Sequence, residues 1–586
     1  RNERGTCRGH TRMLGIVCAL LSLLVALVIY AGSAEAPLAS GFPWQFRLAA
    51  KLRTPILVFI VVPLSFLMRW YRWVTRQVRR LREGAGDART AARHATHVED
   101  IVRQIKQWNS AGRPQLLRTA KPNWAAMSTK LGSNKSTCSL IKVAHMRDVL
   151  HIDREALTAR VEPGATMGQL SEELLPLGLM LQTHIEMESI SVGGCVMGFG
   201  IETNSHRYGF FQESVRELEF VDASGTLRSV TAESDPELFY ALPWSHGSVG
   251  FLTAVTLQLI QCQPYVRMEY EPTSTAEELT RRLRELAESG PSAPDFLEAT
   301  LYSADHAVIQ AGYFEATPSA KLNPINRWYK PFFFRHVETA LRVGAFEESL
   351  PLAHFLHRFS RSIFWEIEDM IPFSSHPVYR CLWGWLGAPE VSLLKLFQGP
   401  VIRRASVQAH VVQESIMPLD KLPEGISKFD GWFGNYPLLV FPVRIFDRGP
   451  LSGFIHPTEA GLDPLPTRTS STAELPHIPV RSGLWVDLGA YGVPRAVRQG
   501  QMWDAKRNVR AMEHWTRQVG GWQVLYTDVF ATPRELRLMF DFRLLDRARE
   551  RLGALDAFPD VYAKIRPEAG IVNLEAELAA ERKGLD

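Results

Sequence analysis

Four glycines lie within eight residues of one segment, and they constrain the fold of this chain more than any other local feature. The segment, residues 189–209, reads SISVGGCVMGFGIETNSHRYG and contains Gly193, Gly194, Gly198 and Gly200. Glycine lets the backbone approach a ligand, and consecutive backbone N–H groups can form a nest for a pyrophosphate. The pattern is neither a Gly-x-Gly-x-x-Gly dinucleotide motif nor a Gly-Lys-Ser/Thr phosphate loop. It therefore indicates either another kind of phosphate-binding loop or a glycine-rich turn without a ligand.

Composition excludes several classes of protein. Of the 586 residues, 46% are hydrophobic and 22% are charged, so disorder is excluded for most of the chain. The 66 basic and 62 acidic residues leave a net charge of only +4, which argues against a nucleic-acid partner. A mean hydropathy of -0.08 excludes a polytopic transporter. Six cysteines without paired spacing predict reduced thiols in a cytosolic compartment and no metal site.

The first 95 residues predict a membrane anchor. Residues 13–32 carry no charge and are long enough for one spanning helix, although a signal peptide has the same basic start and a similar apolar stretch. Residues 55–68 form a second apolar run that is short for a span, and Pro63 is expected to kink it. This run is therefore interpreted as a re-entrant or interfacial segment. The number of spans stays open.

A basic and aromatic stretch follows the second apolar run. Trp and Tyr favour the level of lipid headgroups, and clustered Arg favours the cytoplasmic face and anionic lipid. The alternative is a solvated helix that links the anchor to the rest of the chain. Both interpretations place the following domain in the cytosol, close to a membrane. The residues concerned are Arg69, Trp70, Tyr71, Arg72, Trp73, Arg76, Arg79, Arg80 and Arg82.

The rest of the chain mixes strands with short helices, which predicts an α+β fold rather than a doubly wound parallel sheet. Four regions follow: the anchor at 1–95, a first domain at 96–265, a second domain at 266–500 and a C-terminal segment at 501–586 that packs back on the first. The expected elements are helices at 98–109, 167–177 (with Thr166 as N-cap) and 277–288, strands at 139–150, 159–162, 250–260, 391–397 and 410–417, a β-hairpin at 215–230 and a loop at 449–481.

Several motifs occur in a fixed order around the glycine-rich segment. VEPGATMGQL begins at residue 161, a DASG turn spans 222–225, and DPELFYALPWSHGSVGF begins at 235. This ordered set resembles the PCMH-type FAD-binding domain of the vanillyl-alcohol oxidase superfamily. The resemblance implies FAD extended between two α+β subdomains, followed by an α+β substrate (cap) domain. The matching loop at 128–139 lacks the histidine that many members join covalently to the flavin, so non-covalent FAD is expected.

The same resemblance implies which residues contact FAD. The segment from Ser191 to Thr203 is expected at the pyrophosphate and ribityl chain, with Ser205 and Tyr208 near the isoalloxazine ring. Each of these residues could instead be structural. The implied set is Gly164, Gly168, Ser191, Val192, Gly193, Gly194, Cys195, Val196, Met197, Gly198, Phe199, Gly200, Ile201, Glu202, Thr203, Ser205, Tyr208 and Gly250.

Motifs further along the chain narrow the resemblance to the Δ24-sterol reductase family. They include KLNPINRWYKPFFFRHVE from residue 321, RSIFWEIEDMIPF from 361, HVVQESIMPL from 410 and DLGAYGVPR from 487. The likeness implies reduction of the C24–C25 double bond of a sterol side chain, with NADPH reducing FAD. It also implies the endoplasmic reticulum membrane, a cytosolic catalytic domain, and sterol and membrane lipid as partners. The alternatives are an FAD-dependent oxidase or dehydrogenase of a sugar, lactone or alcohol, and a non-catalytic membrane-bound scaffold.

An isolated alkene is not electrophilic, so we expect a proton to reach C24 while C25 receives hydride from the flavin. This order needs a general acid in a dry pocket. The candidates are Glu414, Tyr491 and Asp528, with Asp487 and Tyr526 beside them in the same motifs. A satisfied structural polar group is the alternative for each. The oligomeric state and the NADPH contacts stay open.

Overall fold

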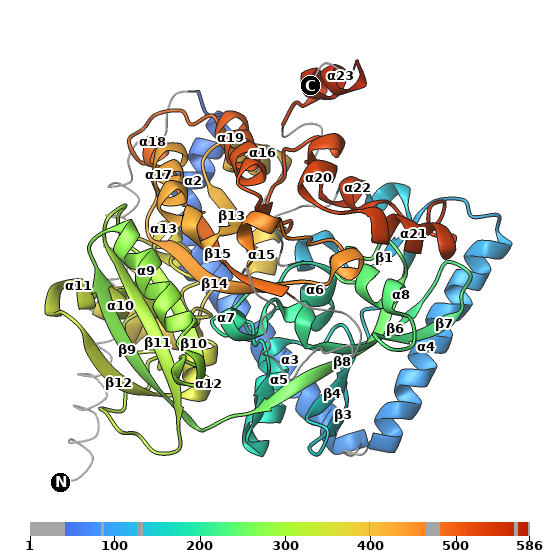
Figure 1. Ribbon diagram of the computed structural model, residues 1–586, viewed down its shortest axis with the longest axis horizontal. Coiled ribbons are helices and arrows are strands. Elements are labelled where there is room, and N and C mark those ends of the chain that lie inside the picture. Colours follow the sequence, from blue (N-terminus) through green and yellow to red (C-terminus); the bar gives the residue numbers. More distant parts are fainter. Residues whose placement is uncertain are drawn as a thin grey trace, which may run out of the picture.

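The computed structural model describes residues 41–83, 87–126, 128, 133–397, 399–462, 481–567 and 572–583. The expected span at 13–32 and most of the expected loop at 449–481 lie outside these residues. The described chain forms a parallel strand pair and two larger sheets with helices around them (Figure 1). This is the α+β class that the mixed pattern predicts.

A small subdomain begins the first domain. Helix α4 (Asp87–Ser110) contains the predicted helix at 98–109 and buries Ile101, Ile105 and Trp108. These side chains share a core with Leu117 of β1 (Leu117–Thr119) and Ile141 of β2 (Ser139–Ile141), which pair in parallel. The core also receives Phe558 from near the C-terminus, so distant parts of the sequence complete it.

The larger subdomain is an antiparallel sheet in the order β3-β4-β8-β6-β7, with β5 against β8. The predicted hairpin is confirmed, since β6 and β7 pair in antiparallel register. Asp222 forms its turn by accepting the N–H groups of Ser224 and Thr226. Thr166 caps helix α5 (Met167–Leu174) as predicted, accepting the Gln169 N–H at 3.3 Å. The strands are β3 (Val149–Asp153), β4 (Thr158–Val161), β5 (Leu179–Leu181), β6 (Val215–Val221), β7 (Leu227–Thr231) and β8 (Phe251–Gln261).

The second domain is built on an eight-stranded antiparallel sheet in the order β12-β9-β11-β10-β14-β15-β13-β16. Helices α9 (Ala276–Ala287), α17 (Leu422–Trp432) and α19 (Ala505–Gln518) pack on one face. The strands are β9 (Tyr265–Thr273), β10 (Phe296–Leu301), β11 (Ala307–Glu315), β12 (Phe346–Pro351), β13 (Val411–Pro418), β14 (Leu438–Asp447), β15 (Arg481–Gly492) and β16 (Trp522–Gln523).

The opposite face of this sheet packs on an aromatic core built by short helices. The prediction of a strand at 391–397 is wrong, since this run forms helix α15 (Val391–Leu396). A short apolar run is compatible with either a helical or a strand period, so the sequence pattern could not distinguish them. The expected strand at 410–417 is confirmed as β13. The helices are α10 (Phe333–Glu338), α11 (Ala340–Val343), α12 (Leu352–Leu356), α13 (Glu366–Met370) and α14 (Pro377–Trp383). Helix α16 (Pro400–Val407) buries Ala405 and Val407 in the core of the other face and contacts α2.

The C-terminal residues pack on both domains. Helix α19 lies on the second sheet, whereas Leu544 and Leu545 of α21 (Arg543–Arg551) share a core with Leu238 and Phe239 of α8 (Pro236–Ala241). An ion pair between Asp235 and Arg551 supports the second contact. The remaining helices are α18 (Arg495–Arg498), α20 (Pro533–Met539), α22 (Val561–Ile565) and α23 (Glu575–Arg582).

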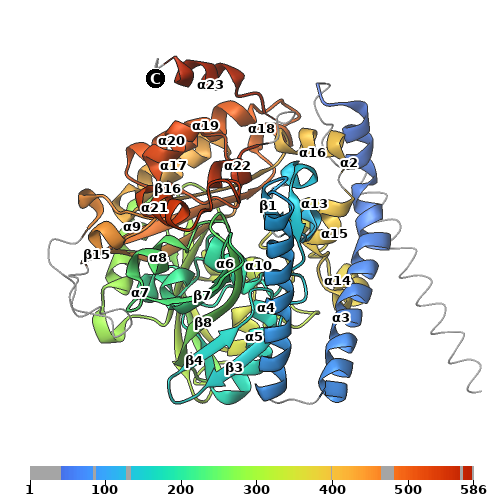
Figure 2. The same ribbon diagram turned by 90° about the vertical axis from the view of Figure 1, so that its right-hand side faces the viewer.

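The second apolar run is part of one long N-terminal helix, which differs from the expected short, kinked segment. Helices α2 (Trp44–Ile56) and α3 (Val62–Glu83) continue through a π-helical turn, Leu57–Val61, along one edge of the molecule (Figure 2). The π turn shifts the hydrogen-bond register just before Pro63, so that proline does not end the helix. From Trp44 to Val78 the helix is long and apolar enough to cross a membrane.

One side of this N-terminal helix is bound to the second domain. Leu57, Val58 and Val61 are buried in the aromatic core, and the Trp383 indole donates to the Val58 carbonyl at 2.8 Å. Arg69 donates to the Ala388 carbonyl at 2.8 Å. The helix is therefore held by specific contacts along part of its length.

Candidate active site

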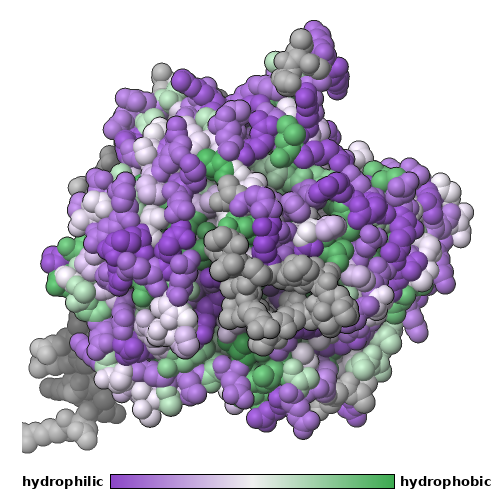
Figure 3. All heavy atoms as spheres, viewed as in Figure 1, coloured by the Kyte–Doolittle hydropathy of each residue, from purple (hydrophilic) through white to green (hydrophobic). Residues whose placement is uncertain are grey.

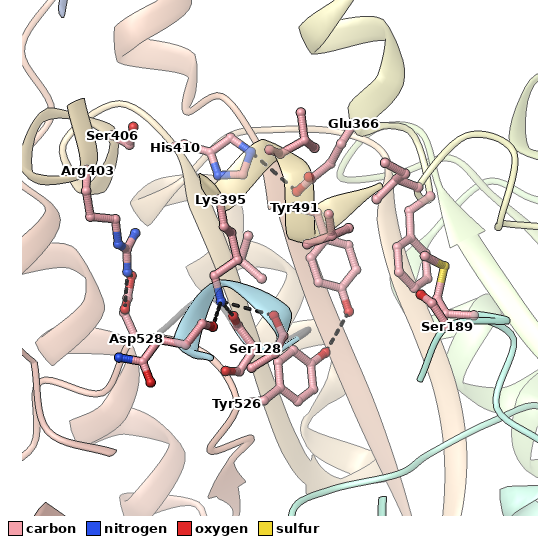
Figure 4. A pocket seen from close by; sticks show the side chains of 18 of the residues that line it. Ser128, Ser189, Glu366, Lys395, Arg403, Ser406, His410, Tyr491, Tyr526 and Asp528 are labelled. Carbon is pink, nitrogen blue, oxygen red and sulfur yellow. Dashed lines mark hydrogen bonds and ion pairs between the residues drawn. The ribbon is translucent and has the colours of Figure 1, made fainter. Parts of the chain in front are cut away.

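A cavity of about 1170 Å³ lies where the N-terminal helix, the first domain and the second sheet meet. Figure 4 shows some of the side chains that line it. Ordinary ligand pockets measure roughly 300–1,000 Å³, so this cavity has room for more than one small ligand. Its wall combines the glycine-rich segment, strands β13 and β15, helix α15 and the chain after β16. Carboxyl and phenol groups gather at its centre, and basic side chains gather near β1.

The glycine-rich segment forms the wall through close backbone packing. Helix α6 (Val192–Met197) begins against the Pro163 turn, where the Gly193 N–H donates to the Pro163 carbonyl at 2.8 Å. A Cβ at Gly193 would lie 2.7 Å from the Pro163 Cβ, so only glycine fits. At the other end of α6, the Gln212 amide donates to the carbonyls of Cys195 at 2.6 Å and Gly198 at 2.7 Å.

The N–H groups of this segment differ from the open nest that the glycines suggested. The N–H of Val192 donates to the Ala165 carbonyl, and those of Gly194 and Cys195 donate to the Ser191 carbonyl. With Gly193 bound to Pro163, four successive N–H groups are used within the chain. Glycine here serves close packing, and these four N–H groups are not free to hold a phosphate.

The structure places the residues expected to contact FAD in two layers. Seven of them line the cavity: Ser191, Gly194, Met197, Gly198, Phe199, Gly200 and Ile201. The others support the segment from behind. Val192, Cys195 and Val196 belong to the hydrophobic core, and a Cβ at Gly164 or Gly250 would come within 2.7 Å of neighbouring atoms.

The remaining expected residues have structural partners of their own. Gly168 packs on Glu188, where a Cβ would lie 3.1 Å from the Glu188 Cβ. The Thr203 carbonyl accepts the Leu297 N–H at 2.8 Å, and the Ser205 hydroxyl accepts the Glu202 N–H at 2.9 Å. Tyr208 is half-buried at the end of α7 (Ser205–Tyr208).

Two carboxyls and two phenols meet at the centre of the cavity. Glu414 on β13 pairs with Gly489 on β15, so Asp487 and Tyr491 flank its position on the same face of the sheet. Gly489 has no side chain, and this leaves the space that the Tyr491 ring occupies. The Tyr526 hydroxyl donates to Glu414 and lies 3.4 Å from the Tyr491 hydroxyl (Figure 4).

Burial controls the protonation of this centre. It raises the pKa of Glu414 to about 7, while the hydrogen bond from Tyr526 acts in the opposite direction. Burial and the neighbouring Glu414 raise the pKa of Asp487 well above its ordinary value. The centre therefore holds protons near neutral pH, as general acid catalysis requires.

Asp528 has a different environment from Glu414. It accepts the Arg403 guanidinium at 2.9 Å, and the Lys395 ammonium near it reaches the Ser128 carbonyl at 2.6 Å (Figure 4). The partner of Asp528 is therefore a cation, whereas the partner of Glu414 is a phenol. All three expected catalytic residues, Glu414, Tyr491 and Asp528, thus line the cavity, but only the first two belong to the proton-bearing centre.

A buried ion cluster fastens the glycine-rich segment to the second domain. Arg358 donates to Glu202 and to Glu298 of β10, each at 2.8 Å, and these side chains are at most 2% exposed. Burial and the adjacent Glu202 raise the pKa of Glu186 well above its ordinary value. No local pattern indicated Arg358, Glu298 or Glu186, because they come from separate segments.

The architecture and the cavity define a flavoprotein fold. Residues 90–231 match the family model described as FAD binding domain, which runs from helix α4 through the glycine-rich segment to the end of β7. The described residues fit FAD, since the segment borders a cavity of sufficient size and cationic side chains stand beside it. The chain thus contains an FAD-binding domain.

Comparison with known proteins identifies the family. The chain is 38% identical over 475 residues to the Delta(24)-sterol reductase of Homo sapiens, covering 80% of this chain and 86% of that protein. A Delta(24)-sterol reductase homolog of Caenorhabditis elegans is 34% identical over 87% of this chain and 94% of its own length. The Delta(24)-sterol reductase of Pisum sativum is 30% identical, covering 88% and 91%. The chain belongs to the Delta(24)-sterol reductase family.

Proposed function

We propose that this protein reduces the C24–C25 double bond of a sterol side chain, with NADPH as the source of electrons and FAD as the carrier. Family membership supports the sterol substrate. The observation that carries the mechanism is the Glu414–Tyr526–Tyr491 centre, which presents proton-bearing groups at an apolar wall of the cavity.

Glu414 is the proposed acid that protonates C24. A pKa of about 7 keeps a large fraction of this carboxyl protonated at neutral pH while leaving it able to release the proton. The Tyr526 hydroxyl then stabilises the carboxylate that remains, because it donates to Glu414. Reduced FAD, when bound, supplies the hydride that C25 receives.

Aromatic side chains form the wall that faces a developing positive charge at C25. Phe364 stacks on Tyr491 with ring centroids 4.9 Å apart, and both line the cavity. Ring faces attract cations, and an apolar wall keeps water from competing with the hydride. Ile363 and Phe364 both have positive φ, a strained conformation that often marks a functional site.

We also propose that the N-terminal helix brings the cavity to a membrane, in the endoplasmic reticulum with the catalytic domain in the cytosol. Trp44, Leu48 and Leu52 line the cavity and yet are 64%, 48% and 45% exposed. Further along the helix, Trp70 and Trp73 are exposed beside Arg72, a combination that suits an anionic lipid surface. By contrast, the face drawn in Figure 3 is mainly hydrophilic. A lipid-dissolved sterol would enter beside α2.

An anaerobic two-step experiment tests the reductase function. NADPH should bleach the yellow protein, and a Δ24 sterol should then restore the colour. In Glu414→Gln, bleaching should proceed at the wild-type rate, whereas recolouring slows at least a hundredfold, within the roughly 10²–10⁴ range of general acid catalysis. Glu347→Gln, an exposed change on β12, serves as the control.

The outcomes separate the parts of the proposal. If no Δ24 sterol recolours the bleached wild type, the reductase function is wrong. If Glu414→Gln recolours as fast as wild type, the acid is another group. For the membrane contact, Leu48→Glu should slow reduction of sterol in vesicles but not of sterol carried by cyclodextrin. Leu538→Glu, an exposed position on α20, should change neither rate.

A further inference from the structure

Four basic side chains gather at one end of the cavity. Arg118 stands on β1, and Lys121 and Lys135 belong to the chain that connects β1 with β2. Lys564 reaches the same end from α22, more than 400 residues away in the sequence. We call these four residues the basic cluster. Three separate segments thus bring positive charge to one part of the cavity wall.

Two members of the basic cluster, Lys135 and Lys564, donate to carbonyl groups rather than to carboxylates. Lys135 donates to the carbonyls of Thr119, at 2.9 Å, and Lys121. Lys564 donates to the carbonyls of His246 at 2.9 Å and Gly247 at 2.7 Å. Within the part of the chain that the structure describes, no ion pair joins any of the four to Asp or Glu.

The arrangement is electrostatically unfavourable without an anion. Burial and the adjacent Arg118 and Lys121 lower the pKa of Lys135 to about 8. Burial and nearby cations also lower the pKa of Lys564 well below its ordinary value. Two deeply buried cations elsewhere in the described chain do pair with carboxylates: Arg358 with two glutamates and Arg448 with Glu213. Cations that stand close together repel one another, so a bound anion would stabilise the cluster.

The position of the cluster indicates what this anion is. The His246 N–H donates to the Met197 carbonyl at 2.9 Å, and Lys564 donates to the His246 carbonyl, so the cluster adjoins the end of helix α6. The N–H groups of residues 192–195, at the opposite end of α6, are used within the chain, whereas the cluster offers cationic side chains to a phosphate beside Met197. Phosphates form strong charge-assisted hydrogen bonds with such groups.

We propose that the basic cluster binds the phosphate groups of a dinucleotide held in the cavity. The inference rests on the proposed function, which supplies two dinucleotides, FAD and NADPH. Both carry a pyrophosphate, and NADPH carries an additional 2′-phosphate of about −1.5 to −2 charges, by analogy with other phosphomonoesters. The shared chemistry is therefore a phosphate or pyrophosphate group, and the experiment distinguishes its two sources.

The test measures binding without any sterol. Lys135→Gln and Lys564→Gln are compared with Lys428→Gln, an exposed change on α17. FAD retention is measured by flavin fluorescence released on gel filtration, and NADP⁺ binding to the oxidised holoenzyme by calorimetry. We expect about a tenfold rise in the dissociation constant of one dinucleotide in each cluster variant, and less than a twofold change in the control.

Each outcome decides the proposal. A rise confined to FAD or to NADP⁺ supports it and identifies the source. Unchanged binding of both, or equal losses of both with a lower melting temperature than the control, overturns it. If the Gln variants do not fold, two other measurements decide the proposal. Lys135→Arg must retain dinucleotide binding, and dinucleotide binding to the wild type must weaken as the salt concentration rises. Failure of either result overturns the proposal. If the protein binds a dinucleotide through the basic cluster but does not reduce a Δ24 sterol, only the proposed function is contradicted.

Discussion

Replacing Arg358 by methionine should cost this protein much of its stability. The guanidinium donates to both oxygens of Glu298 and to one oxygen of Glu202, each at 2.8 Å, in a site from which solvent is excluded. Methionine keeps the apolar stem but removes the charge. Two buried carboxylates then lose their common partner, and Glu186 already stands beside Glu202 with a raised pKa.

The size of the loss follows from the cost of neutralising the carboxylates. Protonating one glutamate of ordinary pKa about 4.3 at pH 7 costs about 1.36 × 2.7, or roughly 3.7 kcal/mol. Breaking a buried ion pair by removing one partner typically costs about 3–5 kcal/mol. With one or two carboxylates to neutralise, the free energy of unfolding should fall by about 3–7 kcal/mol. The first transition in urea, followed by FAD fluorescence, measures this loss.

The pH dependence distinguishes this cause from simple loss of packing. In Arg358→Met, each carboxylate that becomes protonated on folding favours the folded state at low pH and disfavours it as pH rises. The deficit relative to wild type should shrink by about 1.4 kcal/mol per pH unit and carboxylate between pH 8 and pH 5. Adding Glu298→Gln should restore part of the stability. A deficit below 1 kcal/mol at pH 8, or one that does not vary with pH, would refute the reasoning.

Three further outcomes follow from other sites. Gly193→Ala should lower FAD content at least tenfold, measured by the ratio of flavin to protein absorbance, because its Cβ meets Pro163 at 2.7 Å. Gly431→Ala, at an open position of helix α17, should instead raise stability by about 0.5–1 kcal/mol in urea melts. The stability of the wild type should fall by roughly 3 kcal/mol between pH 4 and 8, because the folded pKa of Glu414 is raised to about 7 and its stabilisation is lost as pH rises. Glu414→Gln should remove this pH dependence.

Features encoded within a few residues were readable without the fold. The Asp222 turn specifies the β6–β7 hairpin, and Thr166 specifies the start of α5, because the hydrogen bonds involved join residues two to four positions apart. The ordered glycine motifs also indicated the FAD-binding domain. The run at 391–397 shows the limit, since a seven-residue segment with five apolar side chains fits a strand or a helix equally well until the surrounding residues select one.

The sequence by itself thus determined the family, the class of cofactor and the strand that carries Glu414. Only the tertiary structure decided which charges meet. Arg358 finds Glu202 and Glu298, and Lys135 finds Lys564, across hundreds of residues of sequence. It also showed that the N-terminal helix packs on the second domain with one side and leaves the other exposed. Such contacts depend on how sheets and helices pack in space, and through-space electrostatics and burial leave no periodic pattern in a sequence.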